Sequence, residues 1–260
     1  LGDVYKRQVA VIGAGPAGME AAVTLKQRGF DVVVFDKRDE IGGNLHVAKK
    51  PPFKGKFEWA IDYYKSMAKK LNITMKLGKE VTAQEVLALK PHSILVATGS
   101  NVISIPLEGL DQVQTVQAHD VLANDMQFAN KKVVVIGGGI TGLETALYIN
   151  RQGTNQVSVV DMLPEWPVDM LDMRYQNEAL LEVRHCNDQG VALFYNNKVV
   201  KFADGKLFIE STKDGEVKEL PADVIVLSVG VKPNDALWQE LLASCLLYTS
   251  PSPRDTERSR

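Results

Sequence analysis

Residues 8–36, QVAVIGAGPAGMEAAVTLKQRGFDVVVFD, decide the fold of this 260-residue chain. A short apolar run at 9–12 meets three glycines in a G-x-G-x-x-G pattern, then an alanine-rich stretch and a second apolar run. This order predicts a strand, a tight turn, a helix and a second, parallel strand. Gly13 permits the tight turn, Gly15 lets the backbone approach a pyrophosphate, and Gly18 lets the helix pack close to the strand.

The helix and the acid that follow the turn complete the pattern. The free N–H groups and the positive dipole end of the helix would point at bound phosphates. Asp36 closes the second apolar run, where its carboxylate can accept hydrogen bonds from both hydroxyls of an adenosine ribose. A G-x-G-x-x-G pattern alone is also found in ordinary strand-to-helix turns. Strand, helix, second strand and terminal acid together predict a dinucleotide site.

A second copy of the pattern occupies residues 131–161, KKVVVIGGGITGLETALYINRQGTNQVSVVD. Gly137, Gly139 and Gly142 repeat the turn, and Asp161 ends the next strand. The first glycine and the acid are 23 residues apart in one copy and 24 in the other. An internal repeat of this kind indicates two nucleotide-binding units. The sequence therefore predicts an α/β protein with two Rossmann-like dinucleotide-binding domains.

Composition excludes several classes of protein. The chain carries 30 basic and 32 acidic residues without a clustered basic face, which argues against nucleic-acid binding. No apolar run is long enough to predict a membrane span. The two cysteines form no C-x-x-C motif and the four histidines show no metal-ligand spacing, so we expect neither a dithiol relay nor a metal site. This cysteine usage predicts a reduced, cytoplasmic protein.

Residues 1–8 and 245–260, at the two ends of the chain, lack a hydrophobic period, and their possible coding sequences are related to each other. One codon choice for residues 1–8, LGDVYKRQ, encodes CLLYTSPS, residues 245–252, when its complementary strand is read in another frame. The ends therefore resemble a translated sequencing adapter, and such scars are excluded from fold reasoning. We expect residues 9–244 to be an internal fragment, truncated at both ends and inactive alone, and 245–260 to be disordered.

The glycine motifs resemble the two-dinucleotide flavoprotein reductases, with FAD at the first copy and NAD(P)H at the second. The resemblance rests on five stretches: GAGPAG (13–18), IGGN (41–44), ILVATGS (94–100), GGGITGLE (137–144) and LSVGVKPN (227–234). AKKPPFKGKFEWAIDYY, at 48–64, is similar to the C-terminal part of the Old Yellow Enzyme-like NADH:flavin oxidoreductases. That family includes 2,4-dienoyl-CoA reductases, enoate reductases and bile-acid-modifying oxidoreductases.

The resemblance implies an electron-input module. Hydride would pass from NADH to FAD, and electrons onward to a 4Fe-4S centre and to FMN on an N-terminal barrel domain absent from this sequence. That site would reduce an activated C=C bond of an enoate, a dienoyl-CoA or a bile-acid-like substrate. Two alternatives stay open: a vestigial nucleotide-binding module without hydride transfer, as the resemblance to trimethylamine dehydrogenase allows, and an electron-input protein of the glutamate-synthase small-subunit type.

The same resemblance assigns cofactor-binding residues and no catalytic residue. Near FAD it places Gly13, Gly15, Gly18, Asp36, Gly42, Gly43, Asn44, Val81 (on a strand whose backbone meets adenine), Thr98 and Gly99. Near the nicotinamide dinucleotide it places Gly137, Gly139, Gly142, Asp161 and Glu144. Glu144 would lie by the nicotinamide end, although a residue two positions after the third glycine can also be an ordinary helix-surface residue. The residues that follow Asp161, MLP, offer no cation for a 2′-phosphate, which predicts NADH in preference to NADPH.

The expected organisation follows from these motifs. Residues 9–110 would form the FAD-binding domain, 111–231 the NAD(P)H-binding domain, and 232–244 a return to the FAD domain, between scars at 1–8 and 245–260. Helices are expected near 16–28, 56–71, 83–89 and 172–187. Strands at 191–195, 198–202 and 206–210 would form an antiparallel sheet with Asp-Gly turns after 203 and 213. Thr82 and Glu85 predict a helix capping box, and the lysines between 49 and 56 are expected to be solvated.

Overall fold

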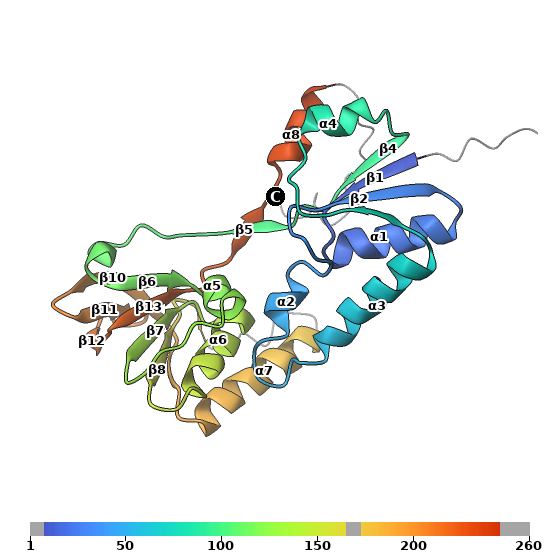
Figure 1. Ribbon diagram of the computed structural model, residues 1–260. Helices are drawn as coiled ribbons and strands as arrows, with labels where there is room; N and C mark the ends of the chain where they lie inside the picture. Colours follow the sequence, from blue (N-terminus) through green and yellow to red (C-terminus); the bar gives the residue numbers. More distant parts are fainter. Residues whose placement is uncertain (1–7, 165–172, 245–260) are drawn as a thin grey trace, which may run out of the picture. The chain divides into compact units, whose positions relative to one another are not determined.

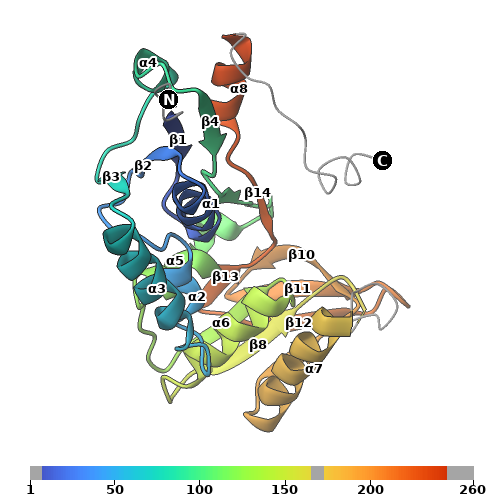
Figure 2. The same ribbon diagram turned by 90° about the vertical axis from the view of Figure 1, so that its right-hand side faces the viewer.

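The computed structural model describes residues 8–164 and 173–244, with side chains omitted at 173–177 (Figure 1, Figure 2). These residues form two compact units. Unit 1 comprises 8–45, 59–100 and 233–244, and unit 2 comprises 46–58, 101–164 and 173–232. The expected scar at 245–260, and residues 1–7 of the expected scar at 1–8, lie outside the described residues, whereas Gln8 belongs to the first strand.

Unit 1 is built on a four-stranded parallel sheet with the order β3-β2-β1-β4. Its strands are β1 (Gln8–Ile12), β2 (Asp31–Phe35), β3 (Thr74–Lys76) and β4 (Ser93–Val96). Inside this sheet, Val9 of β1 pairs with Val32 on one side and with Ser93 on the other. A parallel strand covered on both faces needs a continuous apolar run, and QVAVI supplies it.

Helices cover both faces of this sheet. They are α1 (Pro16–Gln27), α3 (Phe57–Lys70), α4 (Ala83–Ala88) and α8 (Ala236–Ala243). Because successive strand residues point to opposite faces, Val11 packs with Met19 of α1, whereas Ile12 packs with Val86 of α4 and Leu237 of α8. The helices expected near 16–28, 56–71 and 83–89 are confirmed within a residue at each end.

The starts of α1 and α4 follow from local chemistry. α1 begins at Pro16, whose fixed φ suits the first helical position. α4 begins with the predicted capping box: Glu85 N–H donates to Thr82 Oγ1 at 3.2 Å, and Thr82 N–H donates to Glu85 Oε2 at 3.0 Å. Val81 packs against the same cluster as Val86, which is the hydrophobic staple that accompanies such a box.

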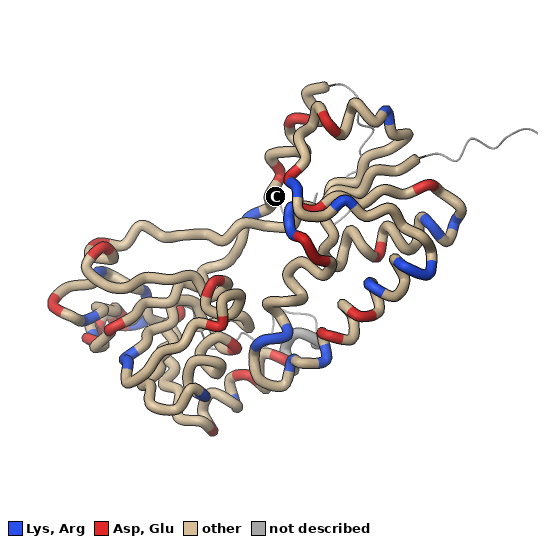
Figure 3. The backbone as a smooth tube through the Cα atoms, in the orientation of Figure 1, with Lys and Arg blue, Asp and Glu red and all other residues tan. Residues whose placement is uncertain are grey.

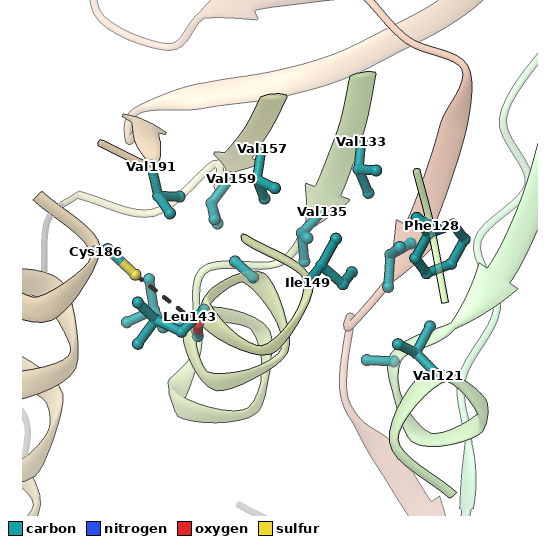
Figure 4. Packing of buried hydrophobic residues seen from close by; sticks show 14 of the residues in the cluster. Val121, Phe128, Val133, Val135, Leu143, Ile149, Val157, Val159, Cys186 and Val191 are labelled. Carbon is teal, nitrogen blue, oxygen red and sulfur yellow. Dashed lines mark hydrogen bonds between the residues drawn. The ribbon is translucent and has the colours of Figure 1, made fainter. Parts of the chain in front are cut away.

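Unit 2 contains a five-stranded parallel sheet with the order β6-β13-β7-β8-β9. The strands are β6 (Gln114–Gln117), β7 (Lys132–Ile136), β8 (Gln156–Val160), β9 (Ala192–Phe194) and β13 (Val224–Leu227). The other elements are the 3-10 helix η1 (Leu110–Gln112), α5 (Ala118–Ala123), α6 (Ile140–Asn150) and α7 (Met173–Asp188). Figure 4 shows Val135 and Val159 of the sheet packing with Leu143 and Ile149 of α6.

A smaller antiparallel sheet adds β10 (Asn197–Ala203), β11 (Lys206–Ser211) and β12 (Val217–Pro221). The expected turn between β10 and β11 is confirmed, because Asp204 and Gly205 have φ of 51° and 73°. The prediction that 191–195 belongs to this sheet is wrong: β9 pairs in parallel with β8. Its partly buried Leu193 packs into the core beneath the parallel sheet, and β12 takes the third antiparallel position instead.

Two short strands accompany the passage of the chain between the units. β5 (Ser100–Val102) and β14 (Val231–Pro233) form a two-stranded sheet. After β14 the chain continues into α8, which belongs to unit 1.

Candidate functional site

The first glycine turn contains two glycines that the fold itself requires. Gly13 has φ of +111°, and a Cβ there would lie 2.2 Å from the carbonyl oxygen of Ala97. A Cβ on Gly18 would lie 1.8 Å from the carbonyl oxygen of Gly13. The Gly13 N–H donates to Phe35 O at 2.7 Å, which ties the turn to the end of β2. A larger residue at either position would displace backbone.

Gly15 differs from its neighbours. Its φ of −72° suits any residue, and the nearest atom to a Cβ would be Gly43 Cα at 3.9 Å, an ordinary contact. The described protein atoms therefore do not require glycine at this helix N-cap. A glycine at a helix N-terminus leaves the backbone N–H groups accessible, so that a phosphate can approach them closely.

Asp36, directly after β2, accepts backbone hydrogen bonds from the first glycine turn and from its own C-terminal neighbours. Its Oδ2 accepts a hydrogen bond from Ala14 N–H at 2.6 Å, and its Oδ1 accepts one from Arg38 N–H at 2.8 Å. The carboxylate thus fastens the glycine turn to the end of β2, a structural function that the sequence reasoning missed. Each carboxylate oxygen has a second lone pair, so these bonds leave acceptor capacity for ribose hydroxyls.

The structure brings the predicted GGN loop against the first turn. Gly42 N–H donates to Ala14 O at 2.9 Å. Gly43 has φ of +52°, and a Cβ there would lie 2.8 Å from Gly15 Cα. Asn44, the next residue, is exposed. Three separate predictions, the turn, Asp36 and the loop, therefore converge in one place in unit 1.

The turn after β4 lies at the same place. Ala97 N–H donates to Ile12 O at 2.7 Å, and Gly99 has φ of +76°. Thr98 Oγ1 donates to Asn234 O at 2.6 Å, and Asn234 N–H donates to Gly99 O at 3.0 Å. The Thr98 hydroxyl therefore fixes the returning segment after β14. No local pattern could reveal a contact between residues 136 positions apart.

Val81 lies between β3 and α4, outside any strand, so the expected strand at this residue is wrong. The short segment after β3 ends in the capping box of α4 and makes no sheet pairing among the described residues. The hydrophobic staple explains the residue type.

Unit 2 repeats the first turn contact for contact. Gly137 has φ of +109°, its N–H donates to Val160 O at 2.8 Å, and a Cβ would lie 2.2 Å from Ser228 O. A Cβ on Gly142 would lie 1.9 Å from Gly137 O. Gly139 again caps the helix with φ of −67°, and within the described residues no heavy atom would lie within 4 Å of its Cβ.

Asp161 repeats the bonds of Asp36. Its Oδ2 accepts from Gly138 N–H at 2.6 Å, and its Oδ1 accepts from Leu163 N–H at 2.8 Å. The two units therefore share one design: two sterically required glycines, an acid that braces the turn, and one glycine, here called the open glycine, whose Cβ would meet no described atom closer than 3.9 Å. The internal repeat predicted from the sequence is confirmed in three dimensions.

Glu144 is not the helix-surface residue that the sequence allowed. Its side chain is 13% exposed and its Oε1 lies 3.0 Å from Lys54 Nζ. Burial raises the pKa of this carboxyl, and the Lys54 ammonium opposes that shift. Lys54 also pairs with Glu178 and is 16% exposed, so the prediction that this lysine is solvated is wrong. No pattern in the sequence around Lys54 predicts these ion pairs.

Cys186 is a packing residue. It is fully buried on α7, and its Sγ lies 3.8 Å from Leu143 O (Figure 4). Burial, with a further contribution from Glu182, raises the pKa of the thiol to about 12. A thiol of this kind is not a nucleophile at neutral pH.

Two parallel α/β units with matching glycine turns define a two-domain, dinucleotide-binding fold of the flavoprotein reductase type, as the sequence predicted. The family described as pyridine nucleotide-disulphide oxidoreductase matches residues 7–245, and the chain belongs to that family. A thioredoxin reductase of T. acidophilum shares the fold, with a TM-score of 0.64 at 19% identity.

Relatives of higher identity include a reductase, an oxidase and a structurally characterised CoA-ester reductase. The bilirubin reductase of Mediterraneibacter gnavus is 35% identical over 229 residues, which cover 88% of this chain and 34% of that protein. The NADH oxidase of Thermoanaerobacter brockii is 37% identical over 236 residues, covering 88% and 35%. The structure of a 2-naphthoyl-CoA reductase in complex with 2-naphthoyl-CoA matches with a TM-score of 0.81 and 30% identity, over 92% and 35%.

The chain thus spans about a third of the length of these relatives. In the part of the chain that the structure describes, no helix has both the length and the apolar character needed to cross a membrane.

Proposed function

We propose that this chain is the electron-input part of a flavin-dependent oxidoreductase, binding FAD at the first glycine turn and NADH at the second. One observation carries the proposal: both units hold the same turn, the same open glycine and the same braced acid. The fold itself needs the turn glycines and the braced acid, whereas a vestigial site would not need to keep the open glycine. The NADH oxidase and bilirubin reductase relatives support the redox class.

The chain's own residues would bind and orient the cofactors. In unit 1 the FAD-binding set is Gly13, Gly15, Gly18, Asp36, Gly42, Gly43, Asn44, Val81, Thr98 and Gly99. In unit 2 the NADH-binding set is Gly137, Gly139, Gly142, Glu144 and Asp161. When bound, the two cofactors supply hydride transfer. The helix N-termini at Gly15 and Gly139 would stabilise the pyrophosphates, and the two acids would accept from the riboses.

The remainder of the protein would use these electrons. We infer that a barrel domain with FMN and a 4Fe-4S centre accepts them and reduces an activated C=C bond. The resemblance at 48–64 supports this, as do relatives named cinnamate reductase, from Clostridium sporogenes, and 2-naphthoyl-CoA reductase. Their names are consistent with conjugated acyl substrates.

A second candidate has its own support. The glutamate synthase [NADPH] small chain of Mycobacterium tuberculosis is 32% identical over 261 residues, covering 85% of this chain and 53% of that protein. On this alternative the chain would supply electrons to a glutamate synthase. Its identity to this chain is lower than the 35% of the bilirubin reductase and the 37% of the NADH oxidase, so we favour the first candidate.

The two open glycines allow a clean test. A Cβ at Gly15 would make one ordinary contact, with Gly43 Cα at 3.9 Å, and a Cβ at Gly139 would meet no described heavy atom within 4 Å, so we expect the valine variants to fold. In the complete protein that contains this chain, Gly15→Val should abolish FAD binding and leave NADH binding intact. Gly139→Val should do the reverse. Loss of flavin from Gly139→Val with NADH binding retained would overturn the assignment of the two turns.

A further inference from the structure

The residue after the first glycine differs between the two turns. It is Ala14 in unit 1 and Gly138 in unit 2. Both residues are buried, and each donates its N–H to the acid of its own turn at 2.6 Å. Gly138 is not among the glycines with positive φ, so no left-handed backbone requires glycine there. The reason for a glycine at 138 therefore lies in its surroundings.

Tyr195 lies where a side chain at 138 would have to go. A Cβ on Gly138 would lie 3.0 Å from Tyr195 Cε1, 3.1 Å from Asp161 Cβ and 3.3 Å from Asp161 Oδ2. The two carbon–carbon separations are shorter than an ordinary van der Waals contact. The tyrosine ring and the acid therefore meet at Gly138, and the missing side chain lets the ring approach the turn.

The loop after β9 holds Tyr195 beside Asp161. Asp161 N–H donates to Phe194 O at 3.0 Å, and Asn197 N–H donates to Asp161 O at 2.9 Å. The buried side chain of Asn197 donates to Tyr195 O at 2.7 Å. The tyrosine ring is partly buried and packs against the core cluster that contains residues of α6 and α7. The backbone and the ring of Tyr195 are thus both fixed.

Unit 1 has a leucine in the corresponding place. Asp36 N–H donates to Lys76 O, and Lys79 N–H donates to Asp36 O, both at 3.2 Å. These two bonds repeat those of unit 2, so Leu77, which follows Lys76, corresponds to Tyr195. The smaller leucine accompanies an alanine in the turn, and the larger tyrosine accompanies a glycine. The two positions therefore compensate each other in volume.

The residues after the two acids differ as well. Asp36 is followed by two basic residues, at 37 and 38 (basic residues are blue in Figure 3), whereas Asp161 is followed by Met162 and Leu163, each 61% exposed. Residues 162–164 include no cation that could pair with a 2′-phosphate. Repulsion between a phosphate and a carboxylate depends on their separation. Discrimination at the ribose therefore depends on where Asp161 holds its charge.

We propose that Tyr195 is a positioning residue of the second dinucleotide site: its ring, admitted by Gly138, keeps the Asp161 carboxylate facing the adenosine ribose, so that the site selects a 2′-hydroxyl over a 2′-phosphate. The inference rests on the proposed function. A 2′-phosphate is tolerated only if the carboxylate turns away from it. A large ring packed against the core leaves less space for that turn than a leucine does.

The test is fluorescence titration of the complete protein that contains this chain, with NADH and with NADPH. Tyr195→Leu, which installs the unit 1 residue, should lower the ratio of NADH to NADPH affinity by about threefold, less than the roughly tenfold expected when the charge is removed. Tyr195→Phe keeps the ring and should keep the wild-type ratio. Leu77→Ala, the matched packing control in unit 1, should keep it too. Each ratio compares two ligands on the same folded protein, so a loss of stability alone does not change it.

Alanine at 138 tests the contact itself. Gly138→Ala places a methyl group against the ring and should weaken NADH binding by about tenfold. Adding Tyr195→Leu gives the pair found in unit 1 and should recover most of that loss. If Gly138→Ala does not fold, a double variant that folds and binds NADH shows the same recovery.

The outcomes separate the inference from the proposed function. An unchanged ratio in Tyr195→Leu, an equal decrease in Tyr195→Phe, or no recovery in the double variant would overturn the inference alone. Absence of NADH binding to the wild type would overturn the proposed function, and the inference with it.

Discussion

Replacing Asp161 with asparagine tests the nucleotide preference and the bracing of the turn together. The carboxylate accepts from Gly138 N–H at 2.6 Å and from Leu163 N–H at 2.8 Å. An asparagine amide offers one acceptor oxygen, so one of these N–H groups would face an NH₂ group. A lost bond of this kind costs about 2 kcal/mol, which lowers the unfolding temperature by roughly 4–8 °C in a chain of this size.

The same change removes a negative charge from the ribose end of the second site. A 2′-phosphate about 4 Å from a carboxylate is repelled by roughly 4 kcal/mol at an effective dielectric constant of about 20. The side chain is partly exposed, so we take about half of that value after screening. Half corresponds to more than about tenfold in affinity. Asp161→Asn should therefore reduce the ratio of NADH to NADPH affinity by about tenfold or more.

Asp36→Asn is the matched control. Its carboxylate makes the same two bonds, at 2.6 and 2.8 Å, in unit 1. It should lose similar stability and keep the donor preference. Fluorescence titration with NADH and NADPH measures the ratio, and thermal unfolding measures the stability. Wild type binding NADPH more tightly, or an equal narrowing of the ratio in Asp36→Asn, would refute the reasoning.

Three further outcomes are expected. Gly142→Ala places a Cβ 1.9 Å from Gly137 O and should destabilise the chain by several kcal/mol in urea unfolding, on the order of an overpacked core; a loss below about 1 kcal/mol would contradict this contact. Cys186, with its thiol pKa raised to about 12, should resist alkylation at pH 7 until the chain unfolds; rapid labelling of Cys186 itself, distinguished from Cys245 by peptide mapping, would show that its thiol is accessible in the native chain. Thr82→Ala breaks the capping box with Glu85 and should cost about 1 kcal/mol, whereas an unchanged unfolding midpoint would show that the box contributes nothing.

The repeated turns could be predicted because their determinants are local. Gly13, Gly18 and the acid at 36 lie within one strand–helix–strand unit, where spacing alone fixes which backbone groups meet. The antiparallel sheet was only partly predictable, since alternation in VALFY suits either sheet. The strand formed by this segment, β9, pairs with β8 instead, because Leu193 packs into the core with residues of α6 and α7.

The contacts of Lys54 and of Thr98 could not be predicted from the sequence. Lys54 is 90 residues from Glu144, and Thr98 is 136 from Asn234. Neither partner carries a pattern that distinguishes it from a solvated residue. Such pairings depend on where the fold returns the chain, which the local hydrophobic period does not encode.

The central claim, that this chain passes electrons from NADH to a flavin, is tested most directly by mixing the complete protein with NADH under anaerobic conditions in a rapid-mixing spectrophotometer. The absorbance of the bound flavin is followed as NADH is added in increasing amounts. We predict that it bleaches as NADH is consumed, and more slowly with NADPH at equal concentration. A flavin that stays oxidised although NADH binds would contradict the account.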